Sequence, residues 1–592
     1  MCDQAHKAHG VGAPPAGHEL RGGMSNTVGP PSRALYVATG VIFGLTLAVF
    51  AVLKLYGWHL AQGDENIYYY MARLVAREGA LPYRDFFFAH PPLHLLPLAL
   101  IAKLAPHSIL ALKLMPMLSG VACGVLVFII AWRSWGPLEA AFATALFLLC
   151  YEVLNTSNYS SGATTTSALT LAGVYYALRE RPMASGVLLA LAMLTGLYAA
   201  PAVVAVALIL ALGRRRVLLR LGIAFLAVWA LLNLAFVLIA GPSYLQQVYL
   251  YGLRMPAGRV GKPFASLLVF WLMTNPMLVW SAVGGAAIRL IQPTKPAQPD
   301  RGKKRGRAAP RRVPYGQWLW KSADRRLWAT MGAIGVLQLL FLSRLGNPMH
   351  YYAVLLFPFI ALAGGYGWAT WLRTAAGWFR PAIRQERGWI PAAVTVLIAG
   401  LATGAIGVFA HTSLPRSTVG QRALGRSEIR YQWADAPAPR WLNTAVKRYI
   451  WTDRYRPGHS YCGWQVYLWS ESQRFPAART LARLVREHTK PSETICGDMQ
   501  VAPLVAMLSG RRLAANMVDT SSMRFYSGLL DVGSFWRQVL RDRLRLVIME
   551  EPGDLYSVPD FGDRLHQECE LRGTIEVSPG HSFQIYEVRS NR

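Results

Sequence analysis

The chain has 592 residues, of which 53% are hydrophobic and only 16% are charged, and its mean hydropathy is +0.27. A water-soluble protein of this length would carry more charge, so these totals exclude an ordinary soluble enzyme and indicate an integral membrane protein. The formal net charge of +30 is also typical of nucleic-acid binding. The basic residues, however, cluster in short segments between apolar runs, which is the pattern of cytoplasmic loops. We therefore expect membrane lipids, and no nucleic acid, among the partners.

The first apolar runs define the N-terminal half of the layout. Residues 1–34 are rich in Gly, Pro, Ala and His without an apolar core, which predicts a disordered cytoplasmic tail. Apolar runs cover residues 35–56 and 109–132, so the polar and aromatic segment 58–106 is expected to be a loop on the outer side of the membrane. Residues 35–411 are predicted to form the transmembrane part, with this loop as its catalytic segment.

Further apolar runs alternate with basic clusters up to residue 411. Residues 183–212 lie between two such clusters and must cross the membrane twice, as two short helices that turn near residues 198–201. The segment 295–326 is the strongest cytoplasmic marker, and the last span is expected at about 390–410. The pattern predicts a polytopic α-helical membrane protein with about eleven transmembrane helices and a cytoplasmic N-terminus.

Residues 412–592 have the composition of a soluble domain. An odd number of spans places this domain on the extracytoplasmic side. Helix and strand patterns alternate along it, which predicts a small α/β domain. Helices are expected at 475–488, 501–508 and 535–540, and strands at 494–498, 546–550, 574–577 and 583–588. An extracytoplasmic location allows one disulfide among Cys462, Cys496 and Cys569, and their spacing selects no pair.

The loop 58–106 carries most of the polar chemistry of the membrane part. Gly63 breaks the chain, and Asp64-Glu65 begins a helical pattern with an apolar face. This pattern predicts an amphipathic helix in the membrane interface, with the tyrosines at 68–70 at headgroup depth. Asp64 is well placed to cap the helix, and it can equally face a cavity as a reactive carboxylate. The residues leave both roles open, and the two are compatible.

Three short motifs in this loop resemble those of a known family. They are D-E-x-x-Y-Y beginning at Asp64, G-x-x-P-Y-R-D-F-F beginning at Gly79, and H-P-P-L beginning at His90. With them, the chain resembles the bacterial membrane glycosyltransferases of the GT-C class, which include relatives of the protein O-mannosyltransferases and the lipid A aminoarabinose transferase. The layout of many spans followed by a tail extends the resemblance to the whole chain, and it implies a GT-C-like transmembrane domain.

The resemblance implies that a sugar moves from a polyprenyl-phosphate-linked donor to a lipid, glycan or protein acceptor at the outer face of the bacterial inner (cytoplasmic) membrane. It also implies inversion at the anomeric carbon. Such a transfer needs a base for the acceptor hydroxyl and stabilisation of a cationic sugar ring, and a carboxylate supplies both. Asp64 is the candidate base, supported by Glu65. Asp85 is a candidate second carboxylate, and its alternative role is that of a turn residue.

Cations must meet the charge that develops on the leaving phosphate. The candidates for phosphate binding are Arg84, His90, Lys262, Arg344, His350 and Tyr351. By resemblance, His90 takes the place of a lysine in a K-P-P-L motif, so its charge depends on pH. His350-Tyr351 begins a pattern that contacts phosphate in relatives. The hinge after the third span carries Asn155 and Asn158, where relatives often have an aspartate.

The lipid-linked donor is the substrate, and no cofactor is assigned. The sequence contains no G-x-G-x-x-G, P-loop or D-x-D motif, which disfavours a nucleotide-sugar donor. A divalent metal near Asp64 and Glu65 remains open, although no ligand set of recognisable spacing supports one. The alternatives are a lipid-linked-sugar flippase and a polysaccharide polymerase or ligase. A transporter usually places ionisable residues within its spans, whereas here the polar residues gather in the loops, which favours the transferase.

Overall fold

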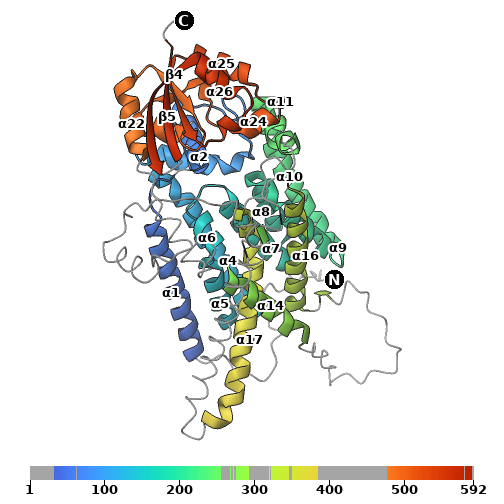
Figure 1. Cartoon of the computed structure of the whole chain (residues 1–592). Coiled ribbons are helices and arrows are strands. Elements are labelled where there is room, and N and C mark those ends of the chain that lie inside the picture. The colour runs from blue at the N-terminus through green and yellow to red at the C-terminus, as the bar shows by residue number, and fades with distance from the viewer. Residues whose placement is uncertain are drawn as a thin grey trace, which may run out of the picture.

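The structure is a computed structural model that describes residues 33–61, 63–254, 275–291, 322–345, 350–383, 477–578 and 581–589, with a few isolated positions between 264 and 320. Most of the predicted tail 1–34, Lys262 and the predicted span at 390–410 lie outside the described residues. A helical bundle forms the lower part of the molecule, and the C-terminal α/β part lies at its upper end (Figure 1).

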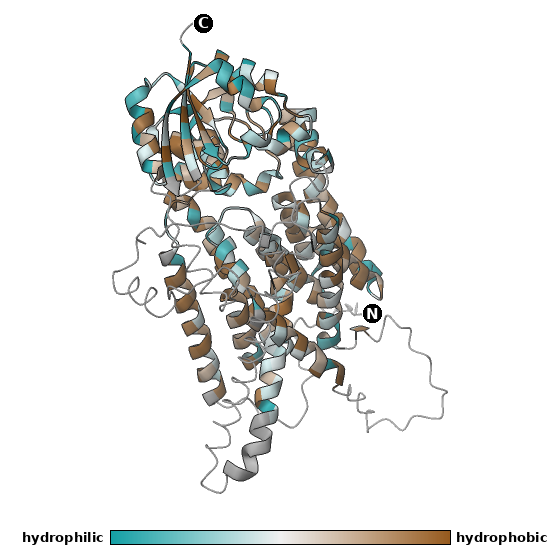
Figure 2. Cartoon of the chain, in the orientation of Figure 1, coloured by the Kyte–Doolittle hydropathy of each residue, from teal (hydrophilic) through white to brown (hydrophobic). Residues whose placement is uncertain are grey.

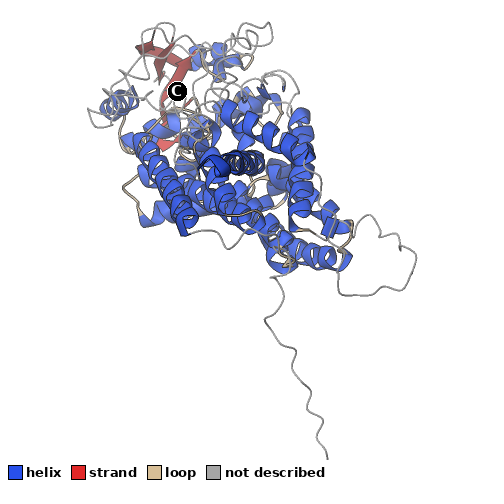
Figure 3. Cartoon of the chain, turned by 90° about the horizontal axis from the view of Figure 1, so that it is seen from below, coloured by secondary structure: helices blue, strands red, loops and turns tan. Residues whose placement is uncertain are grey.

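The bundle is built from apolar helices that lie side by side (Figures 1, 2 and 3). Its longer helices are α1 (Arg33–Tyr56), α4 (Leu114–Ser134), α5 (Pro137–Leu148), α7 (Ala163–Leu178), α8 (Pro182–Thr195), α9 (Ala200–Ala211), α10 (Arg215–Ala240), α14 (Pro276–Ile291), α16 (Ala323–Arg344) and α17 (Phe357–Ile383). Its short helices are α6 (Tyr151–Thr156), α11 (Pro242–Leu245), α12 (Tyr251–Arg254) and the turns η3 (Leu110–Lys113), η4 (Leu197–Ala199), η5 (Gln246–Leu250) and η6 (His350–Leu355).

Four of the described helices are long and apolar enough to cross a membrane, at Leu35–Leu55, Leu110–Ser134, Arg215–Ala240 and Ala323–Arg344. Shorter apolar helices accompany them, including the pair α8 and α9, which turns at η4 as the sequence predicts. Both helices of the pair have a proline in their first turn, where the missing N–H has no intrahelical partner to lose. The protein is therefore a helical membrane protein, while the number of about eleven spans stays a prediction.

The loop 58–106 folds into α2 (Glu65–Arg73), the π-helical turn η1 (Leu74–Glu78), the 3-10 turn η2 (Pro92–His94) and α3 (Leu96–Leu104). Tyr69 and Tyr70 are buried within the protein and do not contact lipid headgroups, whereas the predicted depth of α2 in the membrane stays a prediction. The C-terminal part covers Tyr70, whose hydroxyl accepts a hydrogen bond of 2.8 Å from the backbone N–H of Leu513. The amphipathic pattern of α2 therefore serves an internal interface, because another part of the chain replaces the lipid.

The C-terminal part is an α/β unit built on one five-stranded sheet of order β2-β1-β3-β5-β4, in which β1 runs parallel to β2 and β3, and β5 runs antiparallel to β3 and β4. The strands are β1 (Thr494–Gly497), β2 (Arg512–Leu513), β3 (Leu544–Glu551), β4 (Cys569–Ser578) and β5 (His581–Val588). The helices are α22 (Ala477–His488), α23 (Ala502–Ser509), α24 (Ser522–Tyr526), α25 (Val532–Arg541) and α26 (Phe561–Glu568). All helices and strands expected in this part are confirmed. Cys496 and Cys569 are both buried free thiols, so the disulfide allowed by the sequence does not join them.

One hydrophobic core joins the loop 58–106 to the C-terminal part. It contains Met71 and Tyr83 from the loop, Tyr244 from α11, and Leu504 and Ile548 from the α/β unit. Full burial of a large apolar side chain contributes about 1.5–3 kcal/mol. Shared burial of many such side chains therefore fixes α2 against the C-terminal part, and this fixes the start of α2 as well.

Candidate functional site

Asp64 lies immediately before α2, where the loop meets the bundle. Its backbone is helical, with φ −60° and ψ −20°, and its side chain makes no capping hydrogen bond. The Oδ1 atom is buried and has no hydrogen-bond partner among the described residues. A buried carboxylate oxygen without a donor costs free energy. The structure therefore gives Asp64 no capping role and leaves one of its buried oxygens without a donor among the described residues.

The surroundings of Asp64 raise its pKa to about 6. Burial is the largest cause, because it disfavours the charged form, and repulsion from the carboxylates of Asp519 and Asp554 adds to it. The polar side chains of Tyr159 and Gln500 act in the opposite direction. A general base works best when its pKa lies near the operating pH. Asp64 is thus mostly ionised at pH 7, yet it is more basic than an ordinary aspartate.

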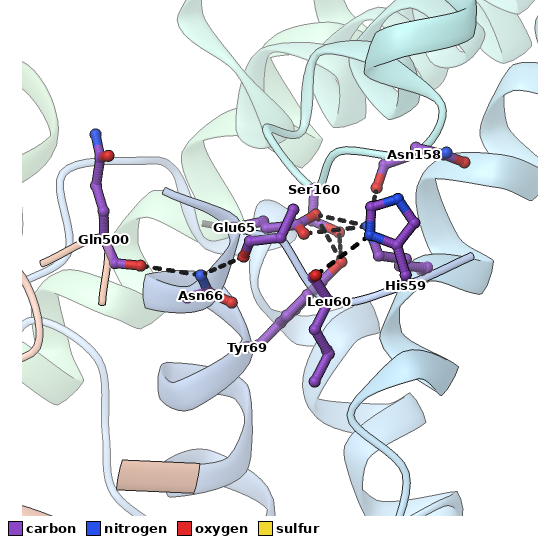
Figure 4. Close-up of polar contacts among 10 residues, drawn as sticks. His59, Leu60, Glu65, Asn66, Tyr69, Asn158, Ser160 and Gln500 are labelled. Carbon is purple, nitrogen blue, oxygen red and sulfur yellow. Dashed lines mark hydrogen bonds and ion pairs between the residues drawn. The ribbon is translucent and has the colours of Figure 1, made fainter. Parts of the chain in front are cut away.

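Glu65 forms a buried ion pair with Lys113. Its Oε1 lies 3.1 Å from Lys113 Nζ, and the two side chains are only 2% and 3% exposed. Lys113 Nζ also donates to the backbone carbonyl of Asn158 at 3.1 Å, and the Tyr69 hydroxyl donates to Glu65 Oε2 at 3.1 Å. Ser160 donates to the Tyr69 hydroxyl at 3.3 Å (Figure 4). These bonds tie α2 to the start of α4 and to the hinge between α6 and α7.

Tyr68 and two histidines form an aromatic cluster beside Asp64. The Tyr68 hydroxyl and His90 Nε2 are 2.8 Å apart, and the ring centroids of Tyr68 and His94 are 4.5 Å apart in an edge-on arrangement. Burial lowers the pKa of His90 to about 4, although Asp519 acts to raise it. His90 is therefore neutral at pH 7 and offers a hydrogen bond rather than a positive charge. Its predicted role as a cation would require a bound anion to raise its pKa.

Two further segments of the bundle bring tyrosines to this cluster. Tyr159 lies in the hinge between α6 and α7, and its ring centroid is 6.0 Å from that of Tyr351 in η6. Tyr198 donates a hydrogen bond of 3.2 Å to the backbone carbonyl of Ser161, which also belongs to the hinge. The site is thus lined by segments that are far apart in the sequence, and Tyr351 is a predicted residue that the structure brings into it.

The C-terminal part closes the site from above with charged and polar groups. The Asn66 amide donates to the backbone carbonyl of Gln500 at 3.0 Å (Figure 4). Asp554 accepts hydrogen bonds from the backbone N–H and the hydroxyl of Ser522, at 2.6 Å and 2.7 Å, and so orders the turn that carries Asp519. Buried Arg524 lies over the ring of Phe87, 4.2 Å from its centroid. Within the described residues, no group of three or more His, Cys, Asp or Glu side chains could hold a metal ion.

The other predicted residues have different surroundings. Asp85 accepts from the backbone N–H of Leu81 at 2.8 Å and forms an exposed ion pair of 2.8 Å with Arg84, which are the contacts of a turn residue. Arg344 is the exposed last residue of α16. His350 is the first residue of η6. These contacts of Asp85 do not bring it to Asp64, whereas Glu65 and His90 belong to the same network of neighbours as Asp64.

Sequence reasoning missed the residues that approach from distant segments. Lys113 is a single charge near the start of an apolar run, and such a charge requires a partner, so this signal was present. Asp519 and Asp554 follow the carboxyl ends of β2 and β3, and ligands of α/β sheets bind at the carboxyl ends of parallel strands. Strand β2 has only two residues, too few to be recognised as a strand in the sequence, so the position of Asp519 after a parallel strand could not be predicted.

Comparison with known proteins supports the fold. No protein-family model matches the sequence, and no characterised protein matches it by sequence. The structure is similar to that of ArnT from Cupriavidus metallidurans in the apo state, with a TM-score of 0.54, 16% identity, and coverage of 93% of this chain and 98% of that chain. The chain shares the fold of the GT-C membrane glycosyltransferases. The resemblance predicted from the sequence is thereby confirmed at the level of the fold.

A second ArnT structure, bound to undecaprenyl phosphate, matches with a TM-score of 0.55 and 15% identity over 95% of this chain and 99% of that chain. The oligosaccharyltransferase of Archaeoglobus fulgidus, in complex with zinc and sulfate, is less similar, with a TM-score of 0.46 and 13% identity over 87% of this chain and 68% of that chain. At these identities the similarity concerns the fold.

Proposed function

We propose that the protein is a glycosyltransferase that moves a sugar from a polyprenyl-phosphate-linked donor to a hydroxyl group of a lipid, glycan or protein at the outer face of the cytoplasmic membrane. The observation that carries this proposal is Asp64, whose Oδ1 is buried without a hydrogen-bond partner among the described residues and whose pKa is raised to about 6. The fold shared with ArnT, a protein solved with undecaprenyl phosphate, supports the choice of donor.

In the proposed reaction, the acceptor oxygen attacks the anomeric carbon of the sugar while the bond from that carbon to the phosphate oxygen breaks. The electron pair of this bond leaves with the polyprenyl phosphate. Asp64 takes the proton of the acceptor hydroxyl as the new C–O bond forms, because a carboxylate is a weak base towards an alcohol until that oxygen becomes acidic. Its negative charge also stabilises the positive character of the sugar ring.

Glu65 has a supporting role in this proposal. Its carboxylate is engaged by Lys113 and Tyr69, so it holds the start of α2 and thereby the backbone of Asp64. Tyr68 and neutral His90 would offer hydrogen bonds to the sugar or to the phosphate. The proposed cations for the phosphate remain Arg84, Lys262, Arg344 and His350. The leaving phosphate needs such cations because its charge grows as the bond breaks.

The test uses purified protein in detergent with a panel of polyprenyl-phosphate sugars, and it measures the release of free polyprenyl phosphate. We expect turnover by the wild type and loss of turnover in Asp64→Asn. The exposed Asp563, on the far helix α26, provides the matched control Asp563→Asn, which is expected to keep full turnover. Equal turnover in Asp64→Asn and wild type would remove Asp64 as the base. Absence of turnover with every donor would count against a transferase, and translocation of the same donors into liposomes would then test the flippase.

A further inference from the structure

A cavity lies at the C-terminal end of α2, between the loop and the C-terminal part. It has a volume of about 150 Å³, roughly ten times the 10–15 Å³ needed to hold one water molecule. We call it the arginine pocket, and the lining residues that matter here are Tyr70, Arg73, Arg77, Glu78, Arg511 and Arg512. Four guanidinium groups therefore face one carboxylate, which leaves a strong excess of positive charge around a space large enough for a phosphate.

The four arginines differ in how far the protein already satisfies them. Arg511 is fully engaged, because it donates to the side chain and the backbone carbonyl of Thr489, both at 2.8 Å. Arg77 donates to the backbone carbonyl of Pro106. Arg512 is 3.9 Å from Glu78 in a loose ion pair between two exposed side chains. Arg511 and Arg77 thus build the walls of the pocket, and Arg512 can exchange its partner.

Arg73 is the least satisfied of the four. Its guanidinium makes no hydrogen bond or ion pair with any residue that the structure describes. Burial lowers the pKa of Arg73, and the neighbouring positive charge of Arg77 lowers it further. A half-buried cation next to another cation is stabilised by an anion between them. The planar guanidinium fork binds carboxylate and phosphate groups with two parallel hydrogen bonds.

We propose that the arginine pocket binds a phosphate or carboxylate group, with Arg73 and Arg512 as the principal ligands. The anion would belong either to the headgroup of a membrane lipid or to the acceptor molecule. Bound there, it would bridge η1 and α2 of the loop to β2 of the C-terminal part, because Arg73 and Arg512 come from these two parts of the chain. Anion binding in this pocket does not depend on the transfer reaction, since the pocket is lined by residues other than those around Asp64; only the assignment of the anion to the acceptor rests on the proposed function.

The first experiment measures binding of inorganic phosphate to the full-length protein in a neutral detergent by calorimetry, with chloride added to keep the ionic strength constant. Saturating polyprenyl phosphate is present, so that a donor site cannot contribute. We expect saturable binding by the wild type and at least a tenfold weaker affinity in the double variant Arg73→Gln/Arg512→Gln. The exposed Arg541 at the end of α25 provides the control Arg541→Gln, with unchanged affinity. Absence of phosphate binding by the wild type, or equal affinity in the folded double variant, would overturn the proposal.

A second experiment identifies the source of the anion. The protein is placed in nanodiscs of phosphatidylcholine alone or with phosphatidylglycerol added, and phosphate binding is measured again. If the wild type binds phosphate more weakly in the discs that contain phosphatidylglycerol, and the double variant shows no such difference, a lipid headgroup is supported as the occupant. Equal phosphate binding in both discs excludes the phosphatidylglycerol headgroup as the occupant and leaves the acceptor as the source of the anion. In both cases the double variant should have lost phosphate binding in either kind of disc. Phosphate binding by the double variant that still changes with the charge of the disc would contradict the proposal.

Discussion

The carboxylate of Glu65 and the ammonium group of Lys113 form an ion pair of 3.1 Å inside the protein, although 48 residues separate them in the chain. The pair joins the start of α2 to the start of a membrane-spanning helix. Because Asp64 immediately precedes Glu65, this contact helps to determine where the candidate base lies. The two acidic residues of one dipeptide thus have different surroundings and different roles.

Loss of one partner of this pair should destabilise the protein. Lys113→Met removes the ammonium partner of the buried carboxylate of Glu65. Breaking a buried ion pair in this way costs about 3–5 kcal/mol, and we expect a lower midpoint of thermal unfolding in detergent. The additional change Glu65→Gln should recover part of this loss, because it removes the uncompensated charge. Arg483→Gln is the control: the ion pair of Arg483 with Glu487 is exposed and 4.0 Å long, and such pairs contribute less than about 1 kcal/mol. Equal effects of Lys113→Met and Arg483→Gln would contradict the buried pairing.

The activity should depend on pH through Asp64. Its pKa of about 6 means that acid below pH 6 protonates the base, so turnover should fall about tenfold for each unit of pH below that value. An ordinary aspartate would produce this decline only near pH 4. The measurement is kcat/KM for the lipid-linked donor between pH 4.5 and 8, followed by the release of polyprenyl phosphate. Asp519→Asn removes a repulsive neighbour and should shift the decline to lower pH, whereas an unchanged profile would separate Asp519 from the site.

Asp64→Asn should be more stable than the wild type while it is inactive. The raised pKa shows that the folded protein disfavours the ionised carboxylate, so its contribution to stability is favourable below pH 4 and is lost as the pH rises from about 4 to 6. At pH 7.5 the neutral amide should therefore add on the order of 1–3 kcal/mol of stability. Asp498, whose pKa burial raises to about 7, titrates in the same range. The comparison must accordingly be made between variant and wild type at each pH, and a less stable variant at pH 7.5 would reject this account.

Asp85→Asn should show that this residue serves the turn. Its carboxylate accepts from the backbone N–H of Leu81 and pairs with exposed Arg84, and an asparagine oxygen can still accept the backbone hydrogen bond. We expect turnover within about threefold of the wild type, compared with the 10²–10⁴-fold contribution of a general base. The assay is the release of polyprenyl phosphate. A loss as large as that in Asp64→Asn would restore Asp85 as a second catalytic carboxylate.

The sequence predicted what depends on local composition and periodicity. Apolar runs identified the bundle helices, and the alternation of strand and helix patterns identified the α/β unit. It could not predict which distant residues meet, such as Asn66 with Gln500, because a hydrogen bond across 434 positions leaves no local signal. The helix α2 illustrates the limit: its apolar face was correctly predicted, but the sequence cannot tell a lipid partner from Leu504 and other residues of the same chain.

Gly162 and Gly79 separate backbone strain from a steric clash. Gly162, in the hinge, has φ +75°, a conformation that favours glycine, and a Cβ atom there would lie 2.3 Å from His94 Nδ1. Gly79 has a similar φ of +65°, but a Cβ atom there would meet no neighbouring atom within 4 Å, so Gly79→Ala incurs only the backbone strain, about 1–2 kcal/mol. Gly162→Ala must in addition displace the imidazole ring, which packs against Tyr68 beside Asp64. We expect a larger loss of thermal stability and a loss of turnover in Gly162→Ala, and only a loss of stability in Gly79→Ala. Equal behaviour of the two variants would show that the imidazole of His94 moves freely and does not position the site.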